Sequence, residues 1–211
     1  MYCDFNVDLI PDKSEISVLA EGVCPVDWAK KCIETAMYNN CGKSVMCRDG
    51  MTQLAAILED FVNGRAESED LELMRDIATV ISTTPGCEIS QKAANALLYS
   101  IEHYSDEWDL HRRKRCSALV CPSYYSLYID PAACTGCGKC LAASPEGAVA
   151  GGEGLIHVIK DDSALKNAEF IAVCPEGAIK KYGAIKPQVP EEPVAVGSFE
   201  AGGGRRRRRR G

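Results

Sequence analysis

Four cysteines in the C-terminal third of this 211-residue chain have a spacing that suits an iron–sulfur cluster. Cys134, Cys137 and Cys140 are separated by two residues each, and Cys174 lies directly before a proline. Cubane [4Fe–4S] clusters are held by four thiolates, and the run C-x2-C-x2-C with a further C-P supplies such ligands. These residues therefore predict a cluster-binding loop closed by a distant fourth cysteine.

An internal repeat decides how many clusters to expect. The tetrapeptide Pro-Glu-Gly-Ala occurs at residues 145–148 and again at 175–178. In chains with two cubane clusters, the last cysteine of each run ligates the other cluster. Under this rule Cys174 completes the first ligand set. The positions of a second set carry unsuitable side chains, namely Ser144, Ala164, Asn167 and Phe170. We predict one [4Fe–4S] cluster, held by Cys134, Cys137, Cys140 and Cys174.

Residues 129–182 resemble a bacterial ferredoxin domain that has lost one of its two clusters. Short strands are expected near residues 128–129 and 157–159, with helices beside the cysteine runs, which gives a small α+β domain. His157 lies on the second expected strand. We expect a structural role for this histidine rather than metal ligation.

A second cysteine-rich loop precedes a helix in the first half of the chain. Cys41 and Cys47 lie in the sequence C-G-K-S-V-M-C-R-D-G, and Cys87 follows 40 residues after Cys47. The loop resembles the C-terminal iron–sulfur domain of the NADH-binding flavoprotein subunit of respiratory complex I. Related domains occur in NAD-linked [FeFe] hydrogenases and formate dehydrogenases. The resemblance covers residues 38–111 and implies a helical domain whose [4Fe–4S] cluster takes electrons from a neighbouring flavin. A ferredoxin domain fused behind it resembles the hydrogenase-type members.

Ser44 is a departure from that family, whose motif C-G-K-C-x-x-C-R-x-G has a cysteine at this position. A serine hydroxyl is a harder and less acidic ligand than a thiol, so it holds iron poorly. Three interpretations remain open. The site binds a [4Fe–4S] cluster with Ser44 or another group as the fourth ligand, or a [3Fe–4S] cluster on Cys41, Cys47 and Cys87. In the third interpretation, the site binds no cluster and the helices serve for docking to a partner.

A possible zinc site follows the helical region. His111, Cys116 and Cys121 are five residues apart at each step, and Cys and neutral His suit tetrahedral Zn²⁺. The basic stretch 112–115 would favour thiolates there. The hydrogenase-type relatives have a similar cysteine pair, which resembles a structural zinc site. A closed site needs a fourth ligand, which His103 or Cys24 could supply. The alternative is a solvated basic hinge with free thiols.

The expected fold is mixed, with an α-helical bundle followed by the small α+β ferredoxin-like domain. Helices are expected from Asp27, over 51–62, over 69–82 and after Ser90. Their apolar stripes, including Leu73 and Val80, are expected to face the core. The expected domains are an N-terminal segment with a helix (1–37), the helical iron–sulfur domain (38–111), a connector (112–128), the ferredoxin-like domain (129–182) and a flexible tail (183–211).

Composition and charge limit the partners. The net charge is −6, but six of the 24 basic residues form the run Arg205–Arg210, and the remaining chain has 18 basic against 30 acidic residues. An acidic body argues against a nucleic-acid interface. The N-terminus lacks a basic and apolar leader, and no apolar run could span a membrane, so we expect a cytoplasmic protein. The twelve cysteines then indicate metal binding rather than a disulfide framework.

No nucleotide-binding motif is present. The chain contains no G-x-G-x-x-G or Walker loop, and only about 40 residues precede Cys41. We therefore expect no flavin and no NAD on this chain, and we identify no catalytic residues.

These observations predict a non-catalytic electron-transfer subunit of an anaerobic, flavin-dependent oxidoreductase complex of the NADH dehydrogenase, hydrogenase or formate dehydrogenase type. It would relay electrons between the flavin of a partner subunit and a ferredoxin or another cluster. The alternative is a structural adaptor in which the cluster and zinc act as folding staples. A third hypothesis is a redox sensor whose arginine tail touches nucleic acid.

Overall fold

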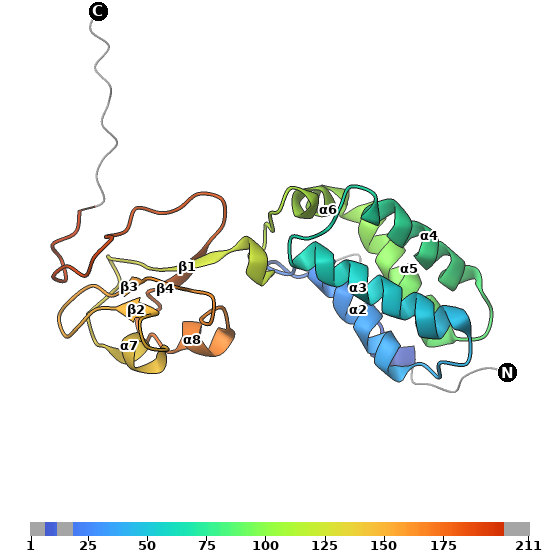
Figure 1. The fold of residues 1–211 in the computed structure, drawn as a ribbon, viewed down its shortest axis with the longest axis horizontal. Coiled ribbons are helices and arrows are strands. Elements are labelled where there is room, and N and C mark those ends of the chain that lie inside the picture. Colours follow the sequence, from blue (N-terminus) through green and yellow to red (C-terminus); the bar gives the residue numbers. More distant parts are fainter. Residues whose placement is uncertain (1–6, 12–18, 201–211) are drawn as a thin grey trace, which may run out of the picture. The chain divides into compact units, whose positions relative to one another are not determined.

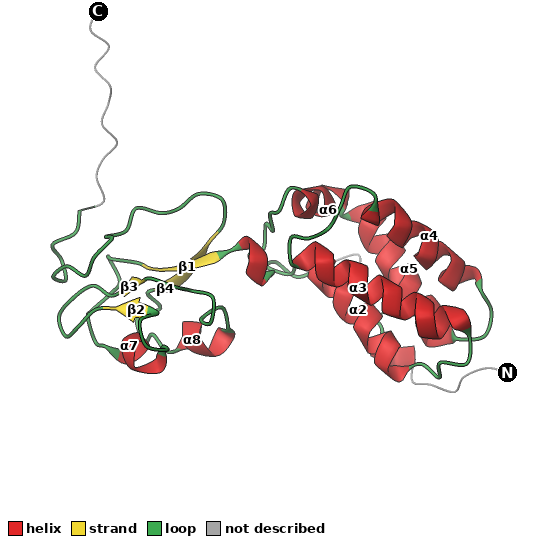
Figure 2. Cartoon of the chain, in the orientation of Figure 1, coloured by secondary structure: helices red, strands yellow, loops and turns green. Residues whose placement is uncertain are grey.

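The computed structural model describes residues 7–11 and 19–200, which form two compact units divided between Tyr125 and Ser126. The first unit is a bundle of helices, and the second is a small α+β unit with short antiparallel sheets (Figures 1 and 2). The predicted fold class is confirmed. The division falls within the predicted connector, whose residues 112–125 belong to the first unit.

Among its described residues, the first unit contains five α-helices: α2 (Pro25–Asn39), α3 (Met51–Val62), α4 (Asp70–Thr83), α5 (Glu88–His103) and α6 (Ser105–Arg112). Helix α2 packs against α3 and α5, and α4 packs against α5. Short helical turns occur at Val7–Leu9, at Met46–Gly50 and at Pro122–Tyr124. The helices thus enclose one apolar core, which also includes cysteines of the two sites that this unit contributes.

The predicted helix bounds differ little from those observed. Helix α3 matches its predicted range, and α4 begins and ends one residue later than expected. Helix α5 starts at Glu88, ahead of the expected Ser90, because Cys87 has extended backbone and forms its N-cap. Helix α2 starts at Pro25, since proline is favoured in a first helical turn, where its missing N–H costs no hydrogen bond.

The apolar stripe of α4 is narrower than its sequence suggested. Leu73 and Val80 were predicted to face the core, but they are 49% and 47% exposed. Ile81, which the predicted stripe also included, is buried, and Met74 and Ala78 are buried beside it. These three residues repeat at three- and four-residue intervals, so they form the row that lies against the bundle. Leu73 and Val80 lie outside that row.

Up to residue 200, where the described part ends, the second unit contains two antiparallel strand pairs. Strand β1 (Ser126–Ile129) pairs with β4 (Ile179–Tyr182), and β2 (Val149–Ala150) pairs with β3 (Val158–Ile159). Two short helices, α7 (Lys139–Ala143) and α8 (Ala168–Ala172), accompany them. Ile129 lies opposite Ile179 in the register. The pairing of β1 with β4 therefore connects the beginning of this unit with the segment that follows Cys174.

Residues 183–200 differ from the expected flexible tail, because they fold back onto the second unit. The backbone N–H of Ile156 donates to the carbonyl of Val194 at 2.7 Å, and that of Val196 donates to Gly154 at 3.0 Å. Lys160 pairs with the carboxylate of Glu192 at 2.7 Å. These bonds give the segment a defined path. The Arg205–Arg210 run lies outside the described residues.

Within the described ranges 7–11 and 19–200, no helix has both the length and the apolar character that crossing a membrane would need.

Candidate cluster and metal sites

The four cysteines predicted to hold a cluster come together in the second unit. The Cys140 thiol is buried, and its pKa is raised to about 11 by that burial and by the neighbouring thiols of Cys134, Cys174 and Cys137. Cys134 and Cys140 are buried, whereas Cys137 is exposed. A set of four thiols with one edge at the surface has the chemistry that a cubane cluster requires. The residues present fit the group that the spacing predicted.

Backbone groups shape this site. The N–H of Ala178 donates to the sulfur of Cys174 at 3.3 Å, so one ligand already receives a hydrogen bond. Gly136, between Cys134 and Cys137, has a positive φ of 71°, and a Cβ there would lie 2.9 Å from the backbone of Gly154. Only glycine fits at 136, because the cysteine loop must touch the chain leading into β3.

The positions of the missing second ligand set are occupied by residues with structural contacts. The side chain of Asn167 caps α8 by accepting from the N–H of Phe170 at 2.7 Å, and the Phe170 ring is buried. The Ser144 hydroxyl donates to the carbonyl of Leu141 at 3.0 Å. These contacts stabilise the fold, and the four positions offer no thiol that could bind a second cluster.

The three cysteines of the first loop also lie together. Burial raises the pKa of the Cys47 thiol, and the nearby thiols of Cys87 and Cys41 raise it further, against a hydrogen bond to the Ser44 backbone. Cys47 lies in the π-helical turn Met46–Gly50, a type of distortion that is frequent at functional sites. Cys87 approaches from the start of α5. The loop and a distant helix thus bring three thiols to one place.

Ser44 and Ser90 have different roles beside these thiols. The Ser44 hydroxyl accepts from the N–H of Met46 at 3.2 Å, and the Ser44 N–H donates to the Cys47 sulfur at 3.3 Å. Ser90 is buried, and its hydroxyl lies 3.2 Å from the Cys87 sulfur. Sequence reasoning missed Ser90, although its place three residues after Cys87 on a helix would put both on one face.

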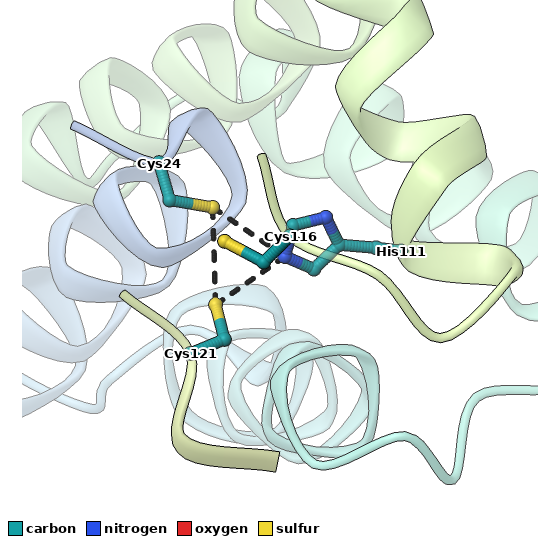
Figure 3. Close-up of side chains that lie close together, drawn as sticks. All are labelled: Cys24, His111, Cys116 and Cys121. Atoms are coloured by element: carbon teal, nitrogen blue, oxygen red, sulfur yellow. Dashed lines mark hydrogen bonds between the residues drawn. The ribbon is translucent and has the colours of Figure 1, made fainter. Parts of the chain in front are cut away.

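A second kind of site lies where α2, α6 and the following loop meet. Cys24, His111, Cys116 and Cys121 are all buried, and their ligand atoms lie within 4.8 Å of one another. Figure 3 shows the three thiols and the imidazole pointing toward a common centre. No other such group occurs among residues 7–11 and 19–200. Cys24 is the fourth member, whereas His103 stacks on Tyr99 and is exposed.

The distances in this group match tetrahedral zinc. Nε2 of His111 lies 3.4 Å from the Cys24 sulfur and 3.3 Å from that of Cys121, and the two sulfurs are 3.8 Å apart. Zn²⁺ bonds of about 2.0–2.3 Å place tetrahedral ligand atoms roughly 3.5–3.8 Å apart. A single ion fits there, whereas a cubane cluster needs its ligands further apart.

The surroundings of His111 orient its ring for metal binding. Nδ1 lies 2.9 Å from the carbonyl oxygen of Glu107, so it carries the hydrogen and leaves Nε2 free to face the thiols. The Glu107 carboxylate, 3.4 Å from Nδ1, accepts from the N–H of Ser117 at 3.0 Å. Contacts with Cys121 and Cys24 lower the pKa of Cys116, which favours the thiolate that Zn²⁺ needs.

One further buried cysteine belongs to none of these groups. Cys32 lies in α2, and burial raises the pKa of its thiol to about 12. A thiol of this kind is a small apolar side chain without reactivity at neutral pH.

Comparisons with known proteins agree with the helical part of this description. Residues 27–111 match the NADH-ubiquinone oxidoreductase-F iron-sulfur binding region. Over 135 residues the chain is 33% identical to the NADP-reducing hydrogenase subunit HndC of Solidesulfovibrio fructosivorans, a match covering 64% of this chain and 28% of that protein. It is 30% identical over 96 residues to a subunit of the NADH-quinone oxidoreductase of Mycobacterium tuberculosis (46% and 22%).

A further relative is the NADP(+)-dependent formate dehydrogenase subunit beta of Moorella thermoacetica, 31% identical over 67 residues (32% and 10%). The chain spans less than a third of the length of these relatives. The predicted resemblance of the helical region to an iron–sulfur binding region is confirmed. The resemblance of residues 129–182 to a ferredoxin stays a prediction.

Proposed function

We propose that this chain is an electron-transfer subunit of a multi-subunit, flavin-dependent oxidoreductase. The observation that carries the proposal is the convergence of Cys134, Cys137, Cys140 and Cys174 in one unit of a chain whose other unit matches an iron–sulfur binding region. A [4Fe–4S] cluster supplies a one-electron carrier at such a set of thiolates. The match to subunits of an NADH-quinone oxidoreductase and a hydrogenase supports a place in a complex of that kind.

The residues of the chain would set the conditions for electron transfer. Buried Cys134 and Cys140 keep water from one side of the ligand set, and exposed Cys137 gives an edge that a redox partner can approach. The N–H of Ala178 stabilises negative charge on the Cys174 sulfur. The flavin and the ferredoxin or cluster at the two ends of the relay would belong to partners.

The Cys41, Cys47 and Cys87 set is proposed as a second, incomplete site. The Ser44 hydroxyl accepts the N–H of Met46, so it would have to bind iron beside that hydrogen bond. We propose a [3Fe–4S] cluster on these three thiolates, because a serine hydroxyl is a poor ligand for iron. Ser90 would then donate its hydroxyl hydrogen to the Cys87 sulfur.

The Cys24, His111, Cys116 and Cys121 group is proposed to hold structural Zn²⁺. Four buried protein ligands leave no open coordination position, which separates structural from catalytic zinc. This closed site favours a second candidate function, a structural adaptor whose metals act as folding staples. The two functions differ in whether the cluster exchanges electrons with a partner.

Purification from the native host without air tests the proposal. We expect a flavoprotein to co-purify and the cluster signal of the chain to appear on addition of NADH or NADPH only when that flavoprotein is present. Cys137→Ala should abolish this reduction and leave the complex assembled, whereas an adaptor would show no nicotinamide-dependent signal in either protein. A stoichiometric flavin on the isolated chain would contradict the proposed division of roles.

A further inference from the structure

His157 is a buried imidazole in contact with a cluster ligand. It directly precedes β3, is 1% exposed, and its Nδ1 lies 3.8 Å from the sulfur of Cys134. Within the described part of the chain, its other ring nitrogen, Nε2, is buried and has no hydrogen-bond partner. Burying a polar ring with one nitrogen unpaired costs stability, so the hydrogen bond that its other nitrogen makes requires an explanation.

The direction of this contact follows from the chemistry of Cys134. A cysteine that ligates iron is a thiolate and has no hydrogen to donate. The hydrogen between the two side chains must therefore be on Nδ1, and the ring must donate to the sulfur. The lone pair of neutral histidine is then on Nε2, the atom that lacks a partner.

The neighbouring chain is shaped to hold this ring. A Cβ at residue 151 would lie 2.3 Å from Cδ2 and 2.8 Å from Cγ of His157, so Gly151 is the only residue that leaves room for it. The backbone of Gly151 is not in the left-handed region, and space alone therefore requires glycine there. At Gly152 a Cβ would only touch Leu155 at an ordinary 3.6 Å. The ring is thus fixed against Cys134 by a local fit at residue 151.

We propose that His157 tunes the cluster of the second unit, donating a hydrogen bond from Nδ1 to the Cys134 sulfur and thereby raising the reduction potential. The inference rests on the proposed function, because it requires a cluster on the four cysteines. One-electron reduction adds negative charge that is shared with the sulfur ligands. A donor to sulfur therefore stabilises the reduced form more than the oxidised form.

His157 differs in kind from the other donor at this site. The N–H of Ala178 belongs to the backbone, so a side-chain substitution there does not remove it. The hydrogen bond to Cys134 comes from a side chain, and a single substitution removes it. The potential of this site can therefore be changed at one residue without touching a ligand.

The first test is a redox titration of the full chain, prepared without air and followed by electron paramagnetic resonance. The signal to follow is the one that Cys174→Ala removes. We expect His157→Leu to keep the iron content and to move the midpoint potential to a more negative value. His157→Gln has an amide donor, so its midpoint potential should lie between those of the wild type and His157→Leu. An unchanged midpoint in a fully loaded His157→Leu protein would overturn the inference.

Gly151→Ala tests the same hydrogen bond without changing the histidine. The added methyl group must displace the ring, so the midpoint should move in the same direction as in His157→Leu. Gly152→Ala is the matched control and should leave the midpoint unchanged. In a His157→Ala background, Gly151→Ala should cause no additional shift. If His157→Leu loses its cluster, the Gly151→Ala and His157→Gln proteins provide the test. The inference is rejected if both of them have the same midpoint potential as the wild type.

Pulsed paramagnetic resonance gives a readout independent of the potential. The chain has three histidines, so labelling with ¹⁵N-histidine marks few sites. We expect a weak ¹⁵N coupling to the reduced cluster that His157→Leu abolishes and that His103→Ala, at an exposed histidine outside every site, retains. No coupling in a loaded protein would contradict the inference alone. No cubane cluster in the second unit of the wild type would instead contradict the proposed function.

Discussion

Two places in this molecule have a serine where a cluster pattern calls for cysteine, and their surroundings differ. Ser44 lies beside three converging thiols, with a buried serine, Ser90, bonded to one of them. Ser144 belongs to a set whose other members are Ala164, Asn167 and Phe170, and the last two cap and fill the fold. The first place keeps three of the four cysteines that the resemblance implies, whereas the second keeps none of the four expected thiols.

The contrast shows that the effect of one replaced ligand on cluster binding depends on whether the neighbouring side chains are still thiols. Phe170 is buried and Asn167 caps a helix, so restoring one thiol near them would meet no partners. Around Ser44 the thiols of Cys41, Cys47 and Cys87 still approach one another. Restoring one thiol there would complete a set of four. The following experiments test this comparison.

The largest effect is expected where the ligand set is complete. Cys174→Ala should abolish the low-potential paramagnetic signal of the reduced cubane in the second unit, because three thiolates cannot ligate all four irons of a cubane. Anaerobic iron and sulfide analysis with spectroscopy measures the loss. Cys32→Ala is the control, since that buried thiol lies outside every site and should keep all iron. Two cubane clusters in the wild-type second unit would contradict the one-set argument.

The closed Cys/His site should respond to the loss of one ligand through stability. Removing one member of a buried, mutually paired set costs about 3 kcal/mol or more, so His111→Ala should lower the melting temperature of the first unit by roughly 10 °C. Metal analysis should show one zinc fewer per chain. The exposed, stacked His103 supplies the control variant, His103→Ala, which should change neither quantity. Full zinc content in His111→Ala would argue against the site.

At the positions of the missing second ligand set, substitutions should change only the stability of the second unit and remove no metal. Phe170→Ala should destabilise the second unit by about 3 kcal/mol, because it leaves a cavity in a packed core. Asn167→Ala removes a helix cap and should cost about 1 kcal/mol. Amide hydrogen exchange in β1 and β4 measures both. Equal and negligible effects would show that these residues do not serve the fold.

The smallest expected effect comes from introducing one cysteine at Ser44 and, in a separate protein, one at Ser144. Ser44→Cys should raise the iron content of the first unit and slow its loss in air, because a fourth thiolate joins three that already converge. Ser144→Cys is the matched variant and should bind no added iron. Iron counting on both proteins, prepared side by side, gives the answer. A gain of iron in Ser144→Cys would remove the distinction between the two places.

The sequence by itself determined the elements and the ligands that lie close together along the chain. Helical periodicity predicted α3 and α4 within one residue, and the C-x2-C-x2-C run identified the loop that begins at Cys134. The tetrapeptide repeat assigned Cys174 to that loop across more than thirty residues. Such predictions are possible because spacing along a chain and helical period are local properties that residue types encode directly.

Only the tertiary structure decided which distant groups meet. Cys24 lies 87 residues from His111, and no spacing rule connects the start of α2 with the end of α6. The contact of His157 with Cys134 and the burial of Met74 in place of Leu73 likewise depend on how elements pack. Residues 183–200 looked flexible because they lack apolar periodicity, yet backbone bonds to residues 154–156 hold them. Backbone pairing and side-chain packing between distant segments are set by the whole fold, and they leave little trace in local sequence.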